Sequence, residues 1–366
     1  MERTNHRRCG VSALYVVDER SVSKPFISAA RAVRDAMIVR MRDLRGLPKA
    51  HLHVHLEGAM RPETLHELAG AAGIDVPPIR GFGSFAAFSG MYLAACEVLT
   101  SAGALARLTR EVIEDTANDG GVWIEPAVYL PHHDVRLGPS EATLETILSA
   151  AADAASANGI GVGVVVAADR TVDPADAVAQ AILAVKYADR GVVGFGLAND
   201  EAGHPPEPFA EAFAIAREAG LLAVPHAGEL EGPESVRGAL DALGAVRLQH
   251  GVRAIEDADL VRRLADSPVC LDVCPTSNVM LSVVPDLAAH PLPALLAAGV
   301  SCSLNADDPL LFGPNLLDEY ELARSTLGLD DTTLAHVAEC SIEASGAPAE
   351  LKARARNAIG GWLAAG

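Results

Sequence analysis

The 366-residue sequence predicts an α/β protein with the closed parallel (β/α)8 architecture of a TIM barrel. Short apolar runs of β type recur along the chain, and longer segments rich in Ala, Leu, Arg and Glu separate most of them. No Gly/Ser-rich or Pro-rich linker divides the chain after residue 47. Strands that alternate with helices in this way are typical of repeated βα units, and eight such units close a barrel.

Eight apolar runs are predicted to be the strands of the barrel. In chain order they cover residues 51–57, 121–129, 159–167, 192–199, 221–226, 246–250, 269–273 and 300–305. Segments with helical periodicity lie between most of these strands, at residues 142–157, 206–219, 234–243 and 256–266. The long gap of residues 58–120 and the helix-like residues 310–366 leave room for more. We therefore expect extra helices after the first strand and at the C-terminus.

The composition excludes several classes of protein. Lys and Arg total 29 against 48 Asp and Glu, so the formal charge is −19, and the basic surface that a nucleic-acid partner requires is missing. No apolar run approaches the roughly 18 residues of a membrane span, and no signal-peptide pattern is present. The six cysteines are scattered, as expected for reduced thiols. We expect a cytoplasmic protein without nucleic-acid or membrane partners, and its oligomeric state is left open.

The first residues differ in charge from the rest of the chain. Residues 1–45 hold ten Lys and Arg against five Asp and Glu, although the whole chain is acidic. Residues 1–43 are therefore predicted to be a loosely ordered N-terminal extension, with a basic targeting segment as the alternative. Residues 44–366 are predicted to form the single barrel domain.

The first predicted strand carries a pair of histidines. His53 and His55 are two residues apart in HLHVHLE, and the two-residue period of a strand points both rings to the same side. A lone buried histidine is usually a core residue, but two on one face at a strand end are better explained by a shared metal ion. His51 lies on the same face and nearer the bottom of the barrel, so it is the weaker candidate ligand.

Further polar residues follow later strands, where a barrel brings strand ends together. His226 and Glu229 occur in HAGE, His250 ends the sixth strand, and Asp307 and Asp308 follow the eighth in SLNADDP. An Asp pair before Pro is by itself more often a turn or a helix cap. Taken together, these groups supply three or four nitrogen and oxygen ligands with a position left open for water. Such a site is typical of catalytic zinc, which lowers the pKa of bound water to about 7.

The segments LPKAHLHVHLEG, HAGE, LQHG, CPTSN and SLNADDPLLF, in this order, resemble the adenosine deaminase family of the amidohydrolase superfamily over about residues 44–350. The resemblance implies one zinc ion per subunit, held by His53, His55, His226 and Asp307. It also implies that Glu229 protonates N1 of a purine and that His250 and Asp308 hold and polarise the attacking water. These three residues are the expected catalytic groups.

The resemblance also indicates where the substrate would bind. Glu57 stands where many relatives have a shorter Asp that contacts the sugar, and Asn199 stands where many have a Gly whose backbone N–H meets purine N3. The aromatic residues Phe85, Phe88 and Tyr92 resemble an apolar gate over the ligand, although the same spacing also fits an ordinary helix core. Asp200 and Glu201 match an acidic pair of the family, for which a structural role is expected.

The expected function is therefore zinc-dependent hydrolytic deamination of a small-molecule purine, adenosine or 2′-deoxyadenosine, to the 6-oxo nucleoside and ammonia. Free adenine or a modified adenosine such as 6-aminodeoxyfutalosine is the alternative substrate. A barrel that binds purines without turnover is the alternative from another class. A second metal is not expected, because residues 192–199 contain no Lys to bridge two ions. The smaller zinc deaminases fit the sequence poorly, because CPTSN does not provide their PCxxC motif.

Overall fold

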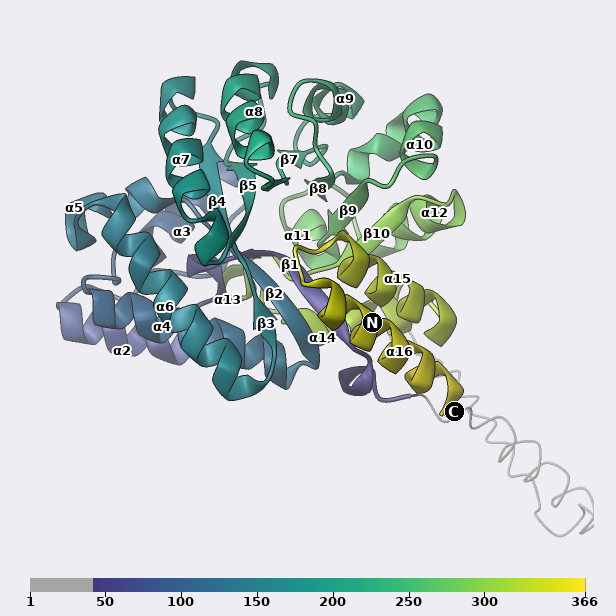
Figure 1. The fold of residues 1–366 in the computed structure, drawn as a ribbon, viewed down its shortest axis with the longest axis horizontal. Helices are drawn as coiled ribbons and strands as arrows, with labels where there is room; N and C mark the ends of the chain where they lie inside the picture. Colours follow the sequence, from purple (N-terminus) through teal and green to yellow (C-terminus); the bar gives the residue numbers. More distant parts are fainter. Residues whose placement is uncertain (1–41, 366) are drawn as a thin grey trace, which may run out of the picture. The chain divides into compact units, whose positions relative to one another are not determined.

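The computed structural model describes residues 42–365, and these form the predicted (β/α)8 barrel, with strands at the centre and helices around them (Figure 1). All paired strands are parallel. They are β1 (Lys49–His55), β2 (Gly121–Val128), β3 (Gly161–Val162), β4 (Val164–Asp169), β5 (Val192–Ala198), β6 (Leu222–Ala223), β7 (His226–Ala227), β8 (Arg247–His250), β9 (Cys270–Val273) and β10 (Ser301–Leu304). These segments correspond to the eight predicted strands, because β3 with β4 and β6 with β7 each form one interrupted strand.

The barrel closes at the site end of β1. The backbone of Asp307, which follows β10, donates to the carbonyl of His53 at 3.1 Å and accepts from the N–H of His55 at 3.0 Å. The side chain of Asn305 continues this junction, since its Oδ1 accepts from the N–H of Leu52 at 2.7 Å. The fifth strand is interrupted because Pro225 has no N–H to donate. The closure therefore places Asp307 between the two histidines of β1.

Helices cover the outside of the barrel. The α-helices are α2 (Pro62–Ala72), α3 (Phe85–Cys96), α4 (Ala102–Asn118), α5 (Asp134–Leu137), α6 (Ser140–Asn158), α7 (Pro174–Lys186), α8 (Ala210–Glu218), α9 (Pro233–Asp241), α10 (Ala258–Ala265), α11 (Pro275–Met280), α12 (Leu292–Ala297), α13 (Pro309–Phe312), α14 (Leu316–Ser325), α15 (Asp331–Ala344) and α16 (Ala349–Ala364). The 3-10 helices are η1 (Leu44–Gly46), η2 (Glu57–Ala59), η3 (Leu130–His133), η4 (Ala188–Arg190), η5 (Glu207–Phe209), η6 (Val252–Glu256) and η7 (Leu287–Ala289).

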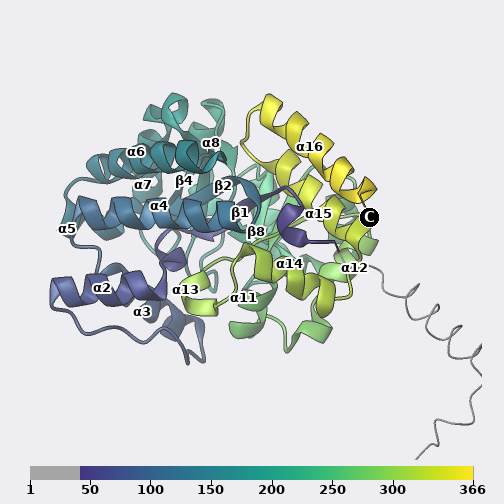
Figure 2. The ribbon, with the colours of Figure 1, turned by 90° about the horizontal axis from the view of Figure 1, so that it is seen from below.

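The extra helices lie where the sequence predicts them. The gap after β1 forms α2, α3 and α4, and the C-terminal segment forms α14, α15 and α16. Ser84 and Ser101 cap α3 and α4, because each hydroxyl accepts from a backbone N–H of the first turn. Figure 2 shows α15 and α16 together on one side of the barrel, away from α2, α4 and α6. No helix within residues 42–365 is long and apolar enough to cross a bilayer.

A buried group of charges lies inside the barrel at the amino-terminal end of β8. The guanidinium of Arg247 lies 2.6 Å from the carboxylate of Glu125 on β2 and 2.6 Å from that of Asp272 on β9. Its Nη1 also donates to the carbonyl of Ala344, at the end of α15. Glu125 accepts from the N–H of Gly346 at 2.6 Å. We call this group the barrel floor; it joins strands from both halves of the barrel to the C-terminal helices.

Residues 1–41 lie outside the described residues, so the loosely ordered extension stays a prediction, as does the state of Cys9 there. Arg42 and Asp43, the last residues of the predicted extension, contact the C-terminal helices: Arg42 donates to Asp331 at 2.9 Å, and the indole of Trp362 donates to the Asp43 carbonyl. The other cysteines, Cys96, Cys270, Cys274, Cys302 and Cys340, are unpaired and buried, as expected of reduced thiols.

Candidate active site

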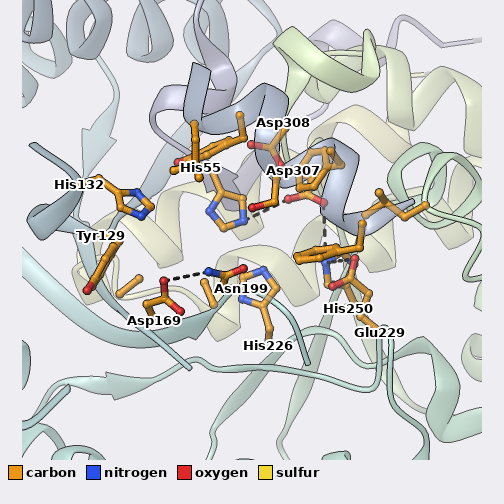
Figure 3. A pocket seen from close by; sticks show the side chains of 18 of the residues that line it. His55, Tyr129, His132, Asp169, Asn199, His226, Glu229, His250, Asp307 and Asp308 are labelled. Atoms are coloured by element: carbon orange, nitrogen blue, oxygen red, sulfur yellow. Dashed lines mark hydrogen bonds and ion pairs between the residues drawn. The ribbon is translucent and has the colours of Figure 1, made fainter. Parts of the chain in front are cut away.

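A pocket opens at the carboxyl-terminal ends of the strands, the place where barrel enzymes carry their catalytic groups. Most of the polar residues predicted for the site line it (Figure 3). In the view of Figure 3, Glu229 and His250 lie at one end of the pocket and Tyr129 and His132 at the other. The lining residues are His55, Phe85, Phe88, Ser89, Tyr92, Leu93, Tyr129, His132, Ala167, Ala168, Asp169, Ala198, Asn199, His226, Glu229, His250, Leu281, Asp307 and Asp308.

The four predicted metal ligands converge beside this pocket. Oδ1 of Asp307 lies 3.2 Å from Nε2 of His53 and 3.3 Å from Nε2 of His55. Nε2 of His53 lies 3.2 Å from Nε2 of His226. Two groups of candidate donor atoms, each within 4.8 Å of one another, share Asp307: one holds His53, His226 and His250, and the other holds His55 and Asp308. The geometry therefore leaves open which histidines would bind a metal ion and which would donate a hydrogen bond.

The hydrogen bonds made by Nδ1 of each histidine ring show whether its Nε2 is free to bind a metal ion or carries a proton. Nδ1 of His53 faces the carbonyl of Asp272 at 3.1 Å, and Nδ1 of His226 faces the carbonyl of Leu197 at 3.0 Å. A carbonyl only accepts, so Nδ1 carries the proton in both rings and the Nε2 lone pair points into the cluster. This orientation by backbone carbonyls is usual for metal-bound histidine. Burial lowers the pKa of His226 and keeps its imidazole in the neutral form that binds metal. The donor set therefore fits a divalent metal ion.

His250 has the opposite orientation. The N–H of Leu292 donates to Nδ1 of His290 at 3.2 Å, which leaves Nε2–H of His290 to donate to Oδ1 of Asn278 at 3.2 Å. Burial lowers the pKa of His290 to about 4, so its ring is neutral near pH 7. The amide of Asn278 then donates to Nδ1 of His250 at 3.1 Å. Nε2 of His250 consequently carries a proton and is a hydrogen-bond donor, which agrees with its predicted role beside the metal.

Asp308 lies against the turn that follows β1. Its Oδ1 is buried and has no hydrogen-bond partner among the described residues. Burial, and then the charge of Asp307, raises the pKa of Asp308 well above its usual range. A Cβ on Gly58 would lie only 1.6 Å from Oδ1 of Asp308. The Asp308 carboxyl group can therefore occupy this position only because residue 58 is a glycine, which has no side chain.

Replacing Gly58 with alanine should displace Asp308 and lower kcat by about 10²-fold, the loss that a shift of roughly 1 Å in a catalytic group can produce. Gly58 lies in η2 and its φ is not positive, so alanine brings a steric clash and no backbone strain. Steady-state kinetics and the melting temperature measure the effect. Gly70→Ala in α2 is the matched control, because nothing lies within 4 Å of its added Cβ. Unchanged kcat in Gly58→Ala would show that the position of Asp308 is not critical.

Glu229 lies next to His250, with its Oε1 3.3 Å from Nε2 of that ring. The side chain is 5% exposed. Burial, followed by the charges of Asp307 and Glu201, raises the pKa of Glu229 well above its usual range. A carboxyl group that keeps its proton near neutral pH can act as a general acid. This environment suits the acid role predicted from the sequence.

Glu57, predicted to contact the substrate, is not among the residues that line the pocket. It follows β1 in η2 and is 1% exposed. Its Oε1 pairs with Nε2 of His133 at 2.6 Å, and its Oε2 accepts from the hydroxyl of Tyr92 at 2.8 Å. Both oxygens of Glu57 are therefore engaged by protein, and of the three residues only Tyr92 reaches the pocket.

Asn199 does line the pocket, in the left-handed conformation that its predicted alignment with a glycine implies, with a φ of 79°. Its Nδ2 donates to Oδ2 of Asp169 at 2.8 Å (Figure 3). Its Oδ1 accepts from the N–H of Asp200 at 2.8 Å. The side chain is thus held at the wall of the pocket.

The predicted gate residues Phe85, Phe88 and Tyr92 all lie on α3 and all line the pocket. Phe88 also stacks on Phe312 of α13, with ring centroids 5.2 Å apart. These residues of α3 therefore line the pocket and also pack in the core, whereas a gate over the ligand stays a prediction. His51, the weaker ligand candidate, is buried and contacts Thr116 and the N–H of Ala306, away from the cluster of histidines and aspartates.

Several residues of the site were not predicted from the sequence. Tyr129, His132 and Asp169 line the pocket, and His133 holds Glu57. All four lie at or just beyond the end of a strand, β2 or β4. Their signal in the sequence is their position: they are polar residues at or just beyond the ends of predicted strands, but they belong to none of the motifs described above.

The barrel and the cluster of histidines and aspartates at its mouth are those of a hydrolase of the amidohydrolase type, with a cluster that could hold a metal ion. The chain belongs to the adenosine deaminase family, whose model, described as Adenosine deaminase, matches residues 48–362. It is a hydrolytic deaminase that acts on a carbon–nitrogen bond.

Three relatives illustrate the similarity. A putative adenosine/adenine deaminase from Streptomyces coelicolor is 46% identical over 341 residues, which is 89% of this chain and 99% of the relative. The structure of an adenine deaminase from Arthrobacter aurescens matches with a TM-score of 0.82 and 32% identity, and covers 87% of this chain and all of that one, 100%. The structure of an amidohydrolase from Burkholderia ambifaria with bound Zn matches with a TM-score of 0.80 and 29% identity, over 87% and 91% of the two chains.

Proposed function

We propose that the protein deaminates a 6-aminopurine by adding water at C6 and releasing ammonia, with one zinc ion per subunit and with free adenine as the preferred substrate. The observation that carries the chemistry is the meeting, in one pocket, of the His/Asp cluster with a buried acid whose pKa is raised. The names of the relatives, adenine deaminase or adenosine/adenine deaminase, support the choice of a 6-aminopurine.

The proposed zinc ligands are His53, His55, His226 and Asp307. Zinc held by three imidazoles and one carboxylate, with a position left open, would activate a water molecule as a nucleophile at neutral pH. The zinc in the Burkholderia ambifaria relative supports this choice of metal.

The remaining groups supply proton transfer and hydrogen bonds. Glu229 would donate its proton to N1 of the purine, which makes C6 more electrophilic. A bound zinc ion would offset the charge of Asp307 and leave Asp308 ionised, so Asp308 would accept a proton from the attacking water. Nε2–H of His250 would donate a hydrogen bond to the oxygen as it bonds to C6. The C6–O bond forms and Asp308 would pass the proton taken from the water to the 6-amino group, which leaves as ammonia when the C6–N bond breaks. The remaining proton of the new C6–OH group would return to Glu229. Adenine and water thus give hypoxanthine and ammonia.

The position of Glu57 favours the free base. A residue that reads a ribose hydroxyl needs a free oxygen on the pocket surface, whereas both oxygens of Glu57 are engaged by His133 and Tyr92. The extra methylene of Glu relative to Asp brings its carboxylate to these partners. Tyr92 then presents its ring to the pocket in place of a carboxylate.

The charge of the pocket disfavours phosphorylated substrates. Its lining contains Asp169, Glu229, Asp307 and Asp308 but no Lys or Arg among the described residues. Phosphate is normally bound by Arg, Lys or backbone N–H groups. A nucleoside monophosphate would bring two negative charges to a wall that has no basic side chain among the described residues.

A substrate panel should therefore show a kcat/KM for adenine at least about tenfold above that for adenosine, the discrimination expected when a sugar finds no dedicated contact. AMP should give no measurable turnover. Ammonia release with adenine, adenosine, 2′-deoxyadenosine, 6-aminodeoxyfutalosine and AMP measures this. A kcat/KM for adenosine equal to or above that for adenine would overturn the preference for the free base.

Adenosine, the substrate expected from the sequence, is the second candidate. The observation that favours it is the polar wall formed by Tyr129, His132 and Asp169, which could bind ribose hydroxyls. The same panel separates the two substrates. A barrel that only binds purines would bind adenine in the zinc-loaded state and release no ammonia.

A further inference from the structure

The carboxylate of Glu201, in the loop after β5, binds the backbone of the segment that carries Glu229. Its Oε1 accepts from the N–H of Gly228 at 2.7 Å, and its Oε2 accepts from Glu229 at 3.0 Å, Leu230 at 2.7 Å and Glu231 at 2.9 Å. The hydroxyl of Ser235, in α9, also donates to Oε1. Glu201 is 2% exposed, so no solvent competes for these bonds. One side chain therefore satisfies four consecutive N–H groups.

Two further features fix this segment. Gly228 has a φ of 73°, and a Cβ there would lie 2.4 Å from Cγ2 of Val236. The buried guanidinium of Arg170 places Nη1 3.9 Å from Oε1 of Glu201, and its Nη2 donates to the carbonyl of His226 at 2.9 Å. Arg170 thus balances the charge of Glu201 and links it to the backbone of a proposed metal ligand.

We propose that Glu201 is a positioning residue for the acid Glu229. Its carboxylate does not line the pocket, so it acts through the backbone of residues 228–231. By holding the turn it keeps the Glu229 carboxyl 3.3 Å from Nε2 of His250, at the end of the pocket where the proton is delivered. The effect on turnover rests on the proposed function, whereas the effect on the backbone does not.

The charge of Glu201 is essential to this arrangement because only a carboxylate offers acceptors on both oxygens. In Glu201→Gln the side chain has nearly the same shape, but one oxygen becomes an NH₂ group. That group would point at backbone N–H donors of residues 228–231, so at least one buried donor would lose its acceptor. The turn would have to shift, and the Glu229 carboxyl would shift with it.

Asp200 provides a matched control. It is the neighbouring acid in the same loop, and among the described residues its carboxylate accepts only from the N–H of Ala202, at 3.0 Å. Asp200→Asn makes the same chemical change one residue away without touching residues 228–231.

The experiment compares the wild-type protein, Glu201→Gln and Asp200→Asn, all zinc-loaded, by steady-state kinetics with adenine, elemental analysis and hydrogen–deuterium exchange of peptides that cover residues 228–231. We expect kcat of Glu201→Gln to fall about 10²-fold, with KM changed by less than about threefold and zinc content unchanged. Exchange should accelerate in those peptides and stay the same elsewhere. Asp200→Asn should match the wild type in every measurement.

Wild-type kcat or wild-type exchange at residues 228–231 in Glu201→Gln would overturn the proposal. The proposal would also be overturned if kcat fell in proportion to a loss of zinc, or if exchange became faster over the whole protein. Glu201 would then contribute to general stability and not to the position of Glu229. If Glu201→Gln does not fold, Ser235→Ala removes one donor to the same carboxylate and should lower kcat several-fold with faster local exchange; no change in either would reject the idea. If the wild type deaminates no 6-aminopurine, the proposed function fails, and the exchange data still decide whether Glu201 holds the turn.

Discussion

Glu229→Gln should retain its zinc and its fold but lose about 10³-fold in kcat, within the range that general acid catalysis contributes. Glutamine matches the shape of the protonated carboxyl and can occupy the same space beside His250. Its amide cannot transfer a proton to N1 of the purine. Steady-state ammonia release, elemental analysis and thermal melting measure the three quantities. Because the substitution is neutral and nearly isosteric, a loss of activity without loss of zinc identifies proton transfer as the missing step.

Glu231→Gln is the matched control for this variant. Glu231 lies two residues away in the same turn, its side chain is exposed, and only its backbone N–H contacts Glu201. It should have wild-type kcat. Near-normal turnover in Glu229→Gln would remove Glu229 from the mechanism.

The pH profile gives an independent readout of Glu229. Burial, and then Asp307 and Glu201, raises its pKa above the usual value, while Arg170 opposes the shift. The active form is the protonated acid, so kcat/KM of the wild type should fall as the pH rises through this raised pKa. The fall should be absent from the residual activity of Glu229→Gln.

Asp307→Ala should lose most of its zinc and nearly all activity. Asp307 supplies the carboxylate that faces both His53 and His55, and its other oxygen accepts from the hydroxyl of Ser277 at 2.6 Å. Removing it takes away a charged ligand and the group that orients two imidazoles, and loss of such partners costs metal affinity at least 10- to 100-fold, in order of magnitude. Elemental analysis after dialysis measures the zinc content.

Asp307→Asn separates ligand loss from backbone strain. Asp307 has a φ of 61°, a conformation that Asn tolerates and Ala does not. Both variants should lose zinc, but only Asp307→Ala should also lose stability of the metal-free protein. Full zinc content in Asp307→Asn would mean that the ligand assignment is wrong.

The sequence predicts the barrel well because each strand is a local apolar run. The predicted bounds of the first strand, 51–57, are shifted by two residues: β1 begins at Lys49 and ends at His55. Glu57 therefore lies in the 3-10 helix that follows. The residues proposed as ligands could be grouped from the sequence because they lie at or near strand ends that must meet in a closed barrel.

The partners of the site side chains were not predictable in the same way. Glu57 meets His133, which is 76 residues away, through an irregular turn for which periodicity gives no side-chain direction. The proton position on His250 depends on Asn278 and His290, whose contact exists only in the folded barrel. The motif around Glu201 indicated an acidic pair, but the backbone amides that Glu201 binds carry no signature in the side-chain sequence.

The barrel floor has a consequence for synthesis of the protein. The carboxylate of Glu125 accepts from the N–H of Gly346, which is 221 residues later in the chain and is therefore made much later. At roughly 5–20 residues per second, the ribosome needs on the order of 10–40 s to make that stretch. Until then Arg247 and its carboxylates lack their last backbone partners, and before β10 is made the nascent strands also keep unpaired edges. Shielding of the nascent chain by chaperones should therefore matter most late in translation, when most of the strands exist but the ring cannot yet be completed.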